Sequence, residues 1–103
     1  MRQPAIEREL NGGVQRLYRF RNGFGASVIR HRGSYGWICG EWELAVVKWV
    51  PDESPDNTWE GWDIQLRYDT PITENVRGWL NEAEADQLLS DIEQLDMEGG
   101  ESD

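Results

Sequence analysis

The residues of this chain best suited to nucleophilic chemistry are a single histidine and a single cysteine. His31 lies between two arginines, and Cys39 follows it in the same glycine-rich segment, HRGSYGWICGE. An imidazole and neighbouring positive charge can activate a thiolate as a nucleophile. Neither residue has a third orienting group or a family signature beside it, so we expect a loop imidazole and a half-buried thiol. The sequence therefore predicts no enzymatic activity.

Carboxylates in the segment PDESPDNT, residues 51–58, could offer oxygen ligands to a calcium ion. Asp52, Glu53 and Asp56 lack the glycine and the terminal glutamate at the spacing of an EF-hand, so we expect a solvated loop. One cysteine and one histidine also exclude a zinc site built on several thiolates or imidazoles. We expect neither a metal nor a cofactor.

The net negative charge of the protein is concentrated in its last fifth. The formal charge of the chain is −10, and residues 82–103 contain nine Asp and Glu but no Lys or Arg. Acids on one face of a predicted helix favour a binding or solubility role over catalysis. Glu93 and Asp96 lie near the negative end of the helix dipole, where they cost stability, and this points to a function. We expect the acids that contact a partner to be Glu82, Asp86, Glu93 and Asp96.

Arginines and aromatic residues are interleaved between positions 16 and 32. On a sheet, such a pattern can hold phosphates and stack bases, so a nucleic-acid-binding module is one alternative. The strongly negative net charge opposes it, and we do not expect direct nucleic-acid binding. The other alternative is structural, with these arginines paired to the acidic helix. The residues are Arg16, Arg19, Arg21, Arg30 and Arg32, with Tyr18, Phe20 and Phe24.

Six tryptophans are more than the core of a small domain readily hides. They are Trp37, Trp42, Trp49, Trp59, Trp62 and Trp79. Trp49 and Trp59 flank the proline-containing loop near strand ends, where an exposed indole is a candidate hot spot for a partner. We expect both to be partly exposed and to belong to a contact surface. The alternative is that all six fill or roof the core.

A β-hairpin must present the arginines. The strings VQRLYRF and FGASVIR predict strands at 14–20 and 24–30, joined by Asn22-Gly23. Asn-Gly favours a type I′ turn, in which both residues have positive φ.

Two further strands and a helix complete the prediction. The apolar run over 42–50 predicts a central strand buried on both faces, and alternation over 62–68 predicts a strand with one wet face. A short helical turn is expected at 73–77, ended by Gly78. The main helix follows a capping box formed by Asn81 and Glu84. Its apolar stripe is Ala85, Leu88, Leu89, Ile92 and Leu95.

These elements predict an α+β domain: a four-stranded antiparallel meander with a C-terminal amphipathic helix packed on one face. We expect a flexible leader over 1–13, a single domain over 14–97 and a disordered acidic tail over 98–103. The core is predicted to contain Val14, Tyr18, Phe20, Val28, Leu44, Val46, Ile64, Leu66, Leu88, Leu89, Ile92 and Leu95.

No apolar run approaches the ~20 residues of a membrane span, and the first residues lack the apolar segment of a secretory signal. We expect a cytoplasmic protein without a membrane contact. The sequence predicts no particular oligomeric state.

Four strings carry a resemblance to a known group. FRNGFGASVIR, followed by SYG, WELAVVKW and YDTPITENVRGWL, resembles small uncharacterised proteins of tailed bacteriophages that infect actinobacteria, over roughly residues 17–95. The shared motifs are Asn22–Ser27, Trp42–Val46 and Asp69–Thr73. The resemblance implies a viral origin and expression in the cytoplasm of a bacterial host. It brings no catalytic residues with it.

We therefore expect a non-enzymatic phage accessory protein that binds a host protein with a basic surface and inhibits or redirects it. A defence nuclease, as for an anti-CRISPR protein or DNA mimic, or another nucleic-acid enzyme would suit carboxylates placed where phosphates bind. The alternatives are a phage structural or assembly component and the arginine-hairpin nucleic-acid module.

Overall fold

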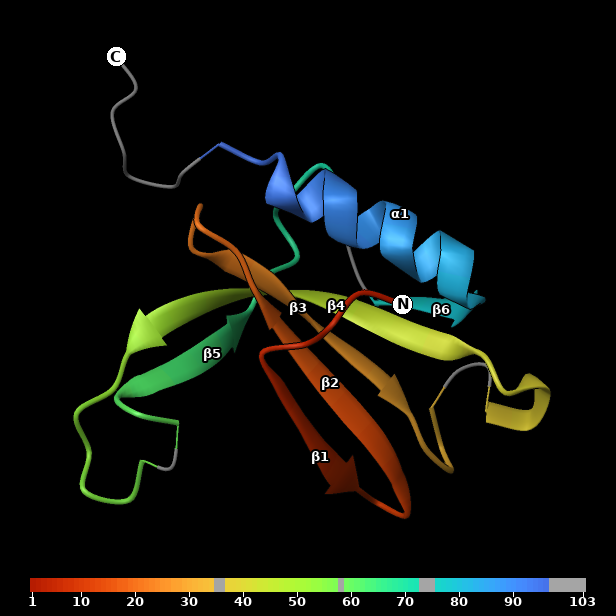
Figure 1. Cartoon of the computed structure of the whole chain (residues 1–103), viewed down its shortest axis with the longest axis horizontal. Helices are drawn as coiled ribbons and strands as arrows, with labels where there is room; N and C mark the ends of the chain where they lie inside the picture. The colour runs from red at the N-terminus through yellow and green to blue at the C-terminus, as the bar shows by residue number, and fades with distance from the viewer. Residues whose placement is uncertain (35–36, 58, 73–75, 97–103) are drawn as a thin grey trace.

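The computed structural model describes residues 1–34, 37–57, 59–72 and 76–96 of the chain, and it is an α+β protein with an antiparallel sheet and one C-terminal helix (Figure 1). This class was predicted correctly, but four strands is wrong, because the described residues form six. The elements are β1 (Ile6–Leu10), β2 (Gly13–Arg19), β3 (Phe24–Arg30), a 3₁₀ turn η1 (Trp37–Cys39), β4 (Trp42–Pro51), β5 (Trp62–Leu66), β6 (Arg77–Leu80) and α1 (Glu82–Glu93).

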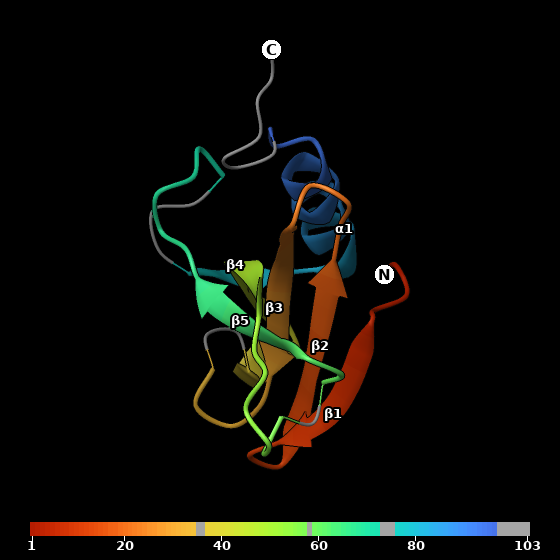
Figure 2. The same ribbon diagram turned by 90° about the vertical axis from the view of Figure 1, so that its left-hand side faces the viewer.

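The strands follow one another in space as β1-β2-β3-β4-β5, and β6 also pairs with β4. Neighbouring strands are antiparallel throughout, with Ser27 opposite Ala45 and Trp49 opposite Ile64. The long β4 serves as the central strand, as its apolar run predicts. Helix α1 packs against β3, β4 and β6, whereas the loop between β4 and β5 extends away from the helix (Figures 1 and 2).

The expected flexible leader over 1–13 is the first correction. Residues 6–10 form the edge strand β1, and Asn11 (φ 50°) and Gly12 (φ 81°) make the turn into β2 with the two positive φ angles of a type I′ hairpin. Three consecutive charged residues separate Ile6 from Leu10 in this strand, so the sequence shows no period-two apolar signal. Asn11-Gly12 is therefore the Asn-Gly pair that adopts the type I′ turn, and this turn joins two strands.

The second Asn-Gly pair makes a different turn. The amide of Gly23 donates to the carbonyl of Phe20 at 3.0 Å, and Gly23 has φ 88°. Asn22 does not take a positive φ, so the predicted type I′ geometry is wrong, although the hairpin itself is confirmed. A left-handed glycine after a tight turn is the usual form of a three-residue hairpin loop. In this turn the Asn22 side chain points to the end of the helix, where it donates to the carbonyl of Ile92.

The segment before the helix is the third correction. Arg77–Leu80 forms strand β6, so Gly78 lies within a strand and does not end a helical turn. Residues 73–75 of the expected turn lie outside the described residues. The pairing of β6 with β4 is irregular between Trp42 and Leu44, and Trp79 has φ 60° there.

The helix begins as predicted. The Asn81 side chain accepts from the amide of Glu84, and the Glu84 carboxylate accepts from the amide of Asn81, which is a complete capping box. Ala85, Leu89 and Ile92 are fully buried against the sheet. The predicted tail over 98–103 lies outside the described residues.

Two apolar clusters lie on the two faces of the sheet. The larger one, under α1, is built around Tyr18, Phe24, Ala26, Val28, Trp42, Leu44, Val46, Leu80, Ala85, Leu89 and Ile92. The smaller one contains Leu17, Val47 and Trp49, with Ile6, Trp59, Trp62 and Ile64 packed against it. Most of the predicted core is confirmed, but Leu66 is wrong: it is 53% exposed near the end of the edge strand β5.

Candidate functional site

The loop between β4 and β5 is held in shape by the side chain of Asn57. Its Oδ1 accepts from the amides of Trp59 and Gly61, both at 2.8 Å, and its Nδ2 donates to the carbonyl of Trp62 at 2.7 Å. Glu60 and Gly61 have φ angles of 59° and 92°, so the chain reverses sharply here. This turn places Trp59 and Glu60 over the face of the sheet that α1 leaves open.

The carboxylate of Asp52 closes the base of the same loop. It accepts from the amide of Ser54 at 3.1 Å and from Nδ2 of Asn57 at 3.2 Å. The backbone hydrogen bond from Ser54, followed by the one from Asn57, lowers the pKa of Asp52 below its ordinary value. Within the segment considered for calcium, Asp52, Ser54 and Asn57 therefore form a hydrogen-bonded loop.

Trp49 forms the floor of the site. It is only 5% exposed, and its indole Nε1 donates to the carbonyl of Tyr18 at 2.8 Å. The expectation that Trp49 is partly exposed is wrong, because the period-two alternation of β4 turns this residue into the second cluster. Trp59 is half-buried and packs on Trp49 with ring centroids 6.0 Å apart and planes tilted by 54°. Such tilted aromatic pairs are favourable beyond their burial.

Arginine side chains lie over the rings of this site. The guanidinium of Arg19 is 3.8 Å from the ring centroid of Trp62 and 5.7 Å from that of Trp49. Arg8 lies 5.2 Å from Trp59, and its Nε donates to Oε1 of Gln15 at 2.6 Å. Arg19 forms no ion pair with any residue that the structure describes, so its positive charge has no carboxylate partner there.

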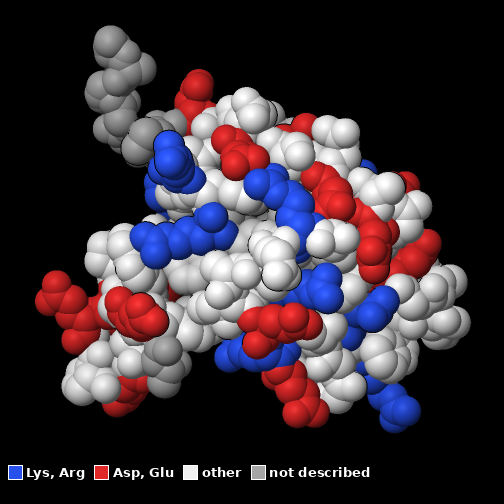
Figure 3. Space-filling model, in the orientation of Figure 1, with Lys and Arg blue, Asp and Glu red and all other residues white. Residues whose placement is uncertain are grey.

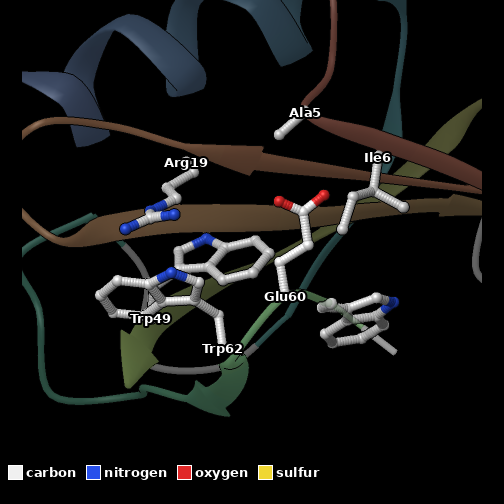
Figure 4. Close-up of a pocket in the computed structure, with 7 residues that line it drawn as sticks. Ala5, Ile6, Arg19, Trp49, Glu60 and Trp62 are labelled. Atoms are coloured by element: carbon white, nitrogen blue, oxygen red, sulfur yellow. The ribbon is translucent and has the colours of Figure 1, made fainter. Parts of the chain in front are cut away.

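These residues enclose a cavity of about 390 Å³, lined by Ala5, Ile6, Arg19, Trp49, Trp59, Glu60 and Trp62. Figure 4 shows the Glu60 carboxylate projecting into the cavity, with Arg19 on one side and Ile6 on the other. A second hollow of about 510 Å³, at the β2–β3 turn, shares Arg19, Trp49 and Trp62 with this cavity. A third of about 220 Å³, in the β4–β5 loop, shares Trp59 and Trp62 with it. We call the three together the tryptophan groove.

The tryptophan groove carries opposite charges at its two ends. The hollow at the β2–β3 turn is lined by Arg19 and Arg21, and the hollow in the β4–β5 loop by Asp52, Asp56 and Asp63. In Figure 3, blue side chains lie over the β2–β3 turn at the upper left and red ones over the β4–β5 loop at the lower left, with an uncharged surface between them.

The acids predicted to contact a partner lie elsewhere, on α1, and three of the four face the N-terminal residues. The amino group of Met1 lies 3.4 Å from Oε1 of Glu82 and 3.7 Å from Oδ2 of Asp86. Arg2 donates its amide to Asp86 and its Nη1 to Glu93, both at 2.9 Å. We call this set of contacts the N-terminal clasp.

The hydrogen bond from Arg2 is the main cause that holds the pKa of Glu93 below its ordinary value, and desolvation opposes it. Asp96 is exposed and forms no ion pair within the described part of the chain. The structure thus brings Trp49 and Trp59 together, but it places the helix acids over the other face of the sheet.

The structure separates the arginines of the first hairpin. Arg16 and Arg30 stack on Trp42 at 5.1 and 4.3 Å, on the helix side, whereas Arg19 lies in the tryptophan groove. Arg16 pairs with Glu7 of β1 at 3.5 Å. Among the described residues, none of the five pairs with an acid of α1, so the expected structural pairing is wrong. They also do not form one continuous basic surface.

His31 and Cys39, the candidates for nucleophilic chemistry, lie in the loop after β3 and in η1. A ring nitrogen of His31 bonds the carbonyl of Arg32 at 2.8 Å, and Cys39 is exposed in η1. The exposed thiol differs from the half-buried one that we expected. Within 1–34, 37–57, 59–72 and 76–96, no group of three His, Cys, Asp or Glu could hold a metal ion.

Sequence reasoning missed Arg19, Glu60 and Trp62 as members of the site. Arg19 and Trp62 could have been found from strand alternation, which places them on the same face as Leu17 and Ile64. The position of the Glu60 side chain depends on the conformation of the β4–β5 loop, and no feature of the sequence predicted that Glu60 would line the site.

No helix among the described residues is long and apolar enough to cross a membrane. No protein-family model matches the chain, and neither the curated proteins nor the solved structures include a significant match.

Proposed function

We propose that this protein acts by binding another protein, without catalysis, and that the tryptophan groove is its main contact surface. The single observation that carries the proposal is Arg19, an exposed arginine held against Trp62 at 3.8 Å with no carboxylate partner in the described chain. Trp and Arg are the residue types most enriched among binding hot spots, and a rigid, pre-formed cluster loses little entropy when a partner binds.

The groove also suits binding better than it suits chemistry. Trp59 and Glu60 are fixed by the Asn57 hydrogen bonds, and Trp49 is fixed by its bond to Tyr18. Among the described residues, Glu60 is the one acid that lines the central cavity, and no Ser, Cys or His of the described chain lines it. A preorganised aromatic cavity without a nucleophile and its base supports recognition.

The acidic face of α1 is a second candidate surface, for a partner that binds phosphates. The observation in its favour is that the first turn of α1 carries Glu82 and Glu84 and the last turn has no basic residue. The N-terminal clasp already neutralises part of this charge, so we assign α1 a role in electrostatic steering of a basic partner. The resemblance to phage proteins suggests that the partner is a protein of a bacterial host, which this protein would inhibit or redirect.

The experiment compares two variants as bait in a cross-linking capture from an actinobacterial lysate. Trp59→Ala with Arg19→Glu alters the groove, and the quadruple variant Glu82→Gln, Asp86→Asn, Glu93→Gln, Asp96→Asn neutralises the helix. We expect the groove variant to lose the captured protein and the helix variant to weaken capture about tenfold at low salt, with less effect at about 300 mM salt.

Loss of capture only in the helix variant would move the contact surface to α1 and support the phosphate-mimic role. Equal capture by both variants and the parent protein would exclude both surfaces.

A further inference from the structure

We infer that the tryptophan groove takes an extended peptide segment of the partner whose charges are separated: an acidic side chain at one end, a proline or aromatic residue in the middle and a basic side chain at the other end. This inference rests on the proposed function and specifies the chemistry of the bound segment. The argument follows the three hollows of the groove in turn.

The end at the β2–β3 turn fits a carboxylate. Arg19 and Arg21 line this hollow, and both are exposed and form no ion pair with a described residue. Trp62 holds the Arg19 guanidinium from one side, so its planar fork of N–H donors is already oriented. A carboxylate can accept two parallel hydrogen bonds from such a fork.

The middle of the groove fits a flat or ring-shaped apolar group. Trp49, Trp59 and Trp62 supply indole surface to a cavity of about 390 Å³, large enough for a proline or aromatic side chain. Aromatic-lined grooves recognise extended proline-rich segments because these lose little entropy on binding. The Glu60 carboxylate projects into the same space and can accept a hydrogen bond from a peptide N–H (Figure 4).

The end in the β4–β5 loop fits a cation. Asp52, Asp56 and Asp63 line this hollow together with Ser54 and Asn57. Asp52 is engaged by Ser54 and Asn57, and one oxygen of Asp63 accepts from the amide of Ile64 at 2.8 Å. Asp56 is exposed and has no ion pair within the described chain, so it is the acid best placed for a lysine or arginine of the partner.

The same charges argue against a nucleic-acid strand in the groove. A strand carries one phosphate at every nucleotide, and it would bring negative charge to the loop acids as well as to the arginines. At the β5 edge the Asp63 side chain caps the amide of Ile64, which disfavours adding the peptide there as a further strand, and the lining of the three hollows lies on the open face of the sheet. The segment therefore lies across the open face of the sheet.

The test is a selection of short random peptides displayed on cells, with the full-length protein as bait and the variant Trp62→Ala as counter-selection. We expect the enriched peptides to carry acids and bases on opposite sides of a proline or aromatic residue. Synthetic versions should bind about tenfold more tightly than peptides of the same composition with the charges interspersed. Binding should shift the indole N–H resonances of Trp59 and Trp62.

A charge reversal supplies the matched control. In the double variant Arg19→Glu, Arg21→Glu both ends of the groove are acidic, so the preference should move to peptides with bases at both ends. The corresponding substitution Arg32→Glu, in the loop after β3, should leave the preference unchanged.

Three outcomes would overturn the inference: no enriched peptide, equal binding of separated and interspersed charges, or tighter binding of a single-stranded oligonucleotide. If no peptide is enriched while Trp59 and Arg19 remain essential for capturing a protein from lysate, the proposed function stands and only the peptide inference fails. If capture also survives the groove variant, the proposed function fails independently.

Discussion

The side-chain amide of Asn22 donates to the main-chain carbonyl of Ile92 at 2.8 Å, joining the first hairpin to the end of the helix across 70 positions of sequence. The same nitrogen lies 3.3 Å from the carbonyl of Glu93 and 3.0 Å from that of Leu95. Its Oδ1 accepts from the amide of Phe24 at 3.0 Å. The last turn of α1 has no basic residue, so this amide adds a donor to the carbonyls at the helix end, where the Ile92 carbonyl also accepts from the amide of Leu95 at 3.1 Å.

Replacing Asn22 by Ala should therefore lower the free energy of unfolding by about 1–3 kcal/mol, since the buried amide of Phe24 and the carbonyls of Glu93 and Leu95 each lose a hydrogen-bond partner. Asn22→Asp should lower it at least as much, because a carboxylate would face those oxygens. Denaturant unfolding measures both. Asn11→Asp, an exposed turn residue, is the matched control and should change little; a similar loss at Asn11 would contradict the assigned role.

Gly25 lies beneath the indole of Trp49, and we predict that it tolerates no side chain. A Cβ at this position would overlap the carbonyl oxygen of Tyr18 and come within 2.7 Å of the indole nitrogen of Trp49. Gly25→Ala should cost about 3 kcal/mol or more. Gly23→Ala, where the main cost is a positive φ and the nearest neighbour is the flexible Lys48, should cost about 1 kcal/mol. Thermal unfolding of the two variants measures this difference. Equal melting temperatures would show that β2 and β3 separate to accommodate the methyl group at position 25.

Trp49 and Trp59 pack on each other, but we expect them to differ in their effect on folding. Trp49→Ala should lower the free energy of unfolding by about 3–5 kcal/mol, because it opens a cavity in the second cluster and leaves the Tyr18 carbonyl without its donor. Trp59→Ala should cost less than half as much, since the ring is only half-buried. Calorimetric unfolding provides the comparison. A Trp59 variant as unstable as the Trp49 variant would make Trp59 a structural residue and weaken its use as a binding probe.

Stability should fall in acid as the N-terminal clasp is protonated. The folded-state pKa of Glu93 is lowered by Arg2, so its contribution is complete above the unfolded-state value of 4.5 and is lost as the pH falls through the lower folded-state pKa. Asp52 and Asp69, whose pKa values also lie below 3.8, add to the same decline. We expect the melting temperature to drop steadily below about pH 4.5 and the variant Glu93→Gln to show a shallower drop. Identical pH profiles of parent and variant would exclude the clasp as a contributor.

Trp79 has a positive φ of 60° and is 56% exposed, so its backbone is strained without full burial of the ring. Replacing it by Asn, which tolerates this conformation, should leave the melting temperature unchanged or raise it by a few degrees, equivalent to about 1 kcal/mol at most. A clear decrease would mean that the indole packs on β6 or β4 more than its exposure suggests.

The sequence alone determined the α+β class, the hairpin of β2 and β3, the central strand β4 and the capped start of α1. Each of these follows from residues close together in the chain: the Asn81–Glu84 capping box, the apolar run over 42–50 and the alternation that begins at Trp62. Local periodicity reports which face of an element is apolar, and that is enough to choose between helix and strand. It also indicated that β4 is buried on both sides.

Only the tertiary structure decided what covers each face and which residues meet there. The pairing register puts Arg19, Trp49 and Trp62 on one face, and the Asn57 turn brings Trp59 over them. The N-terminal residues, expected to be flexible, form β1 and the N-terminal clasp, because the acids of α1, from Glu82 at its start to Glu93 at its end, provide carboxylate partners for Met1 and Arg2. These contacts join residues dozens of positions apart, and a pattern read over a short window contains no information about which distant segment will pair with it.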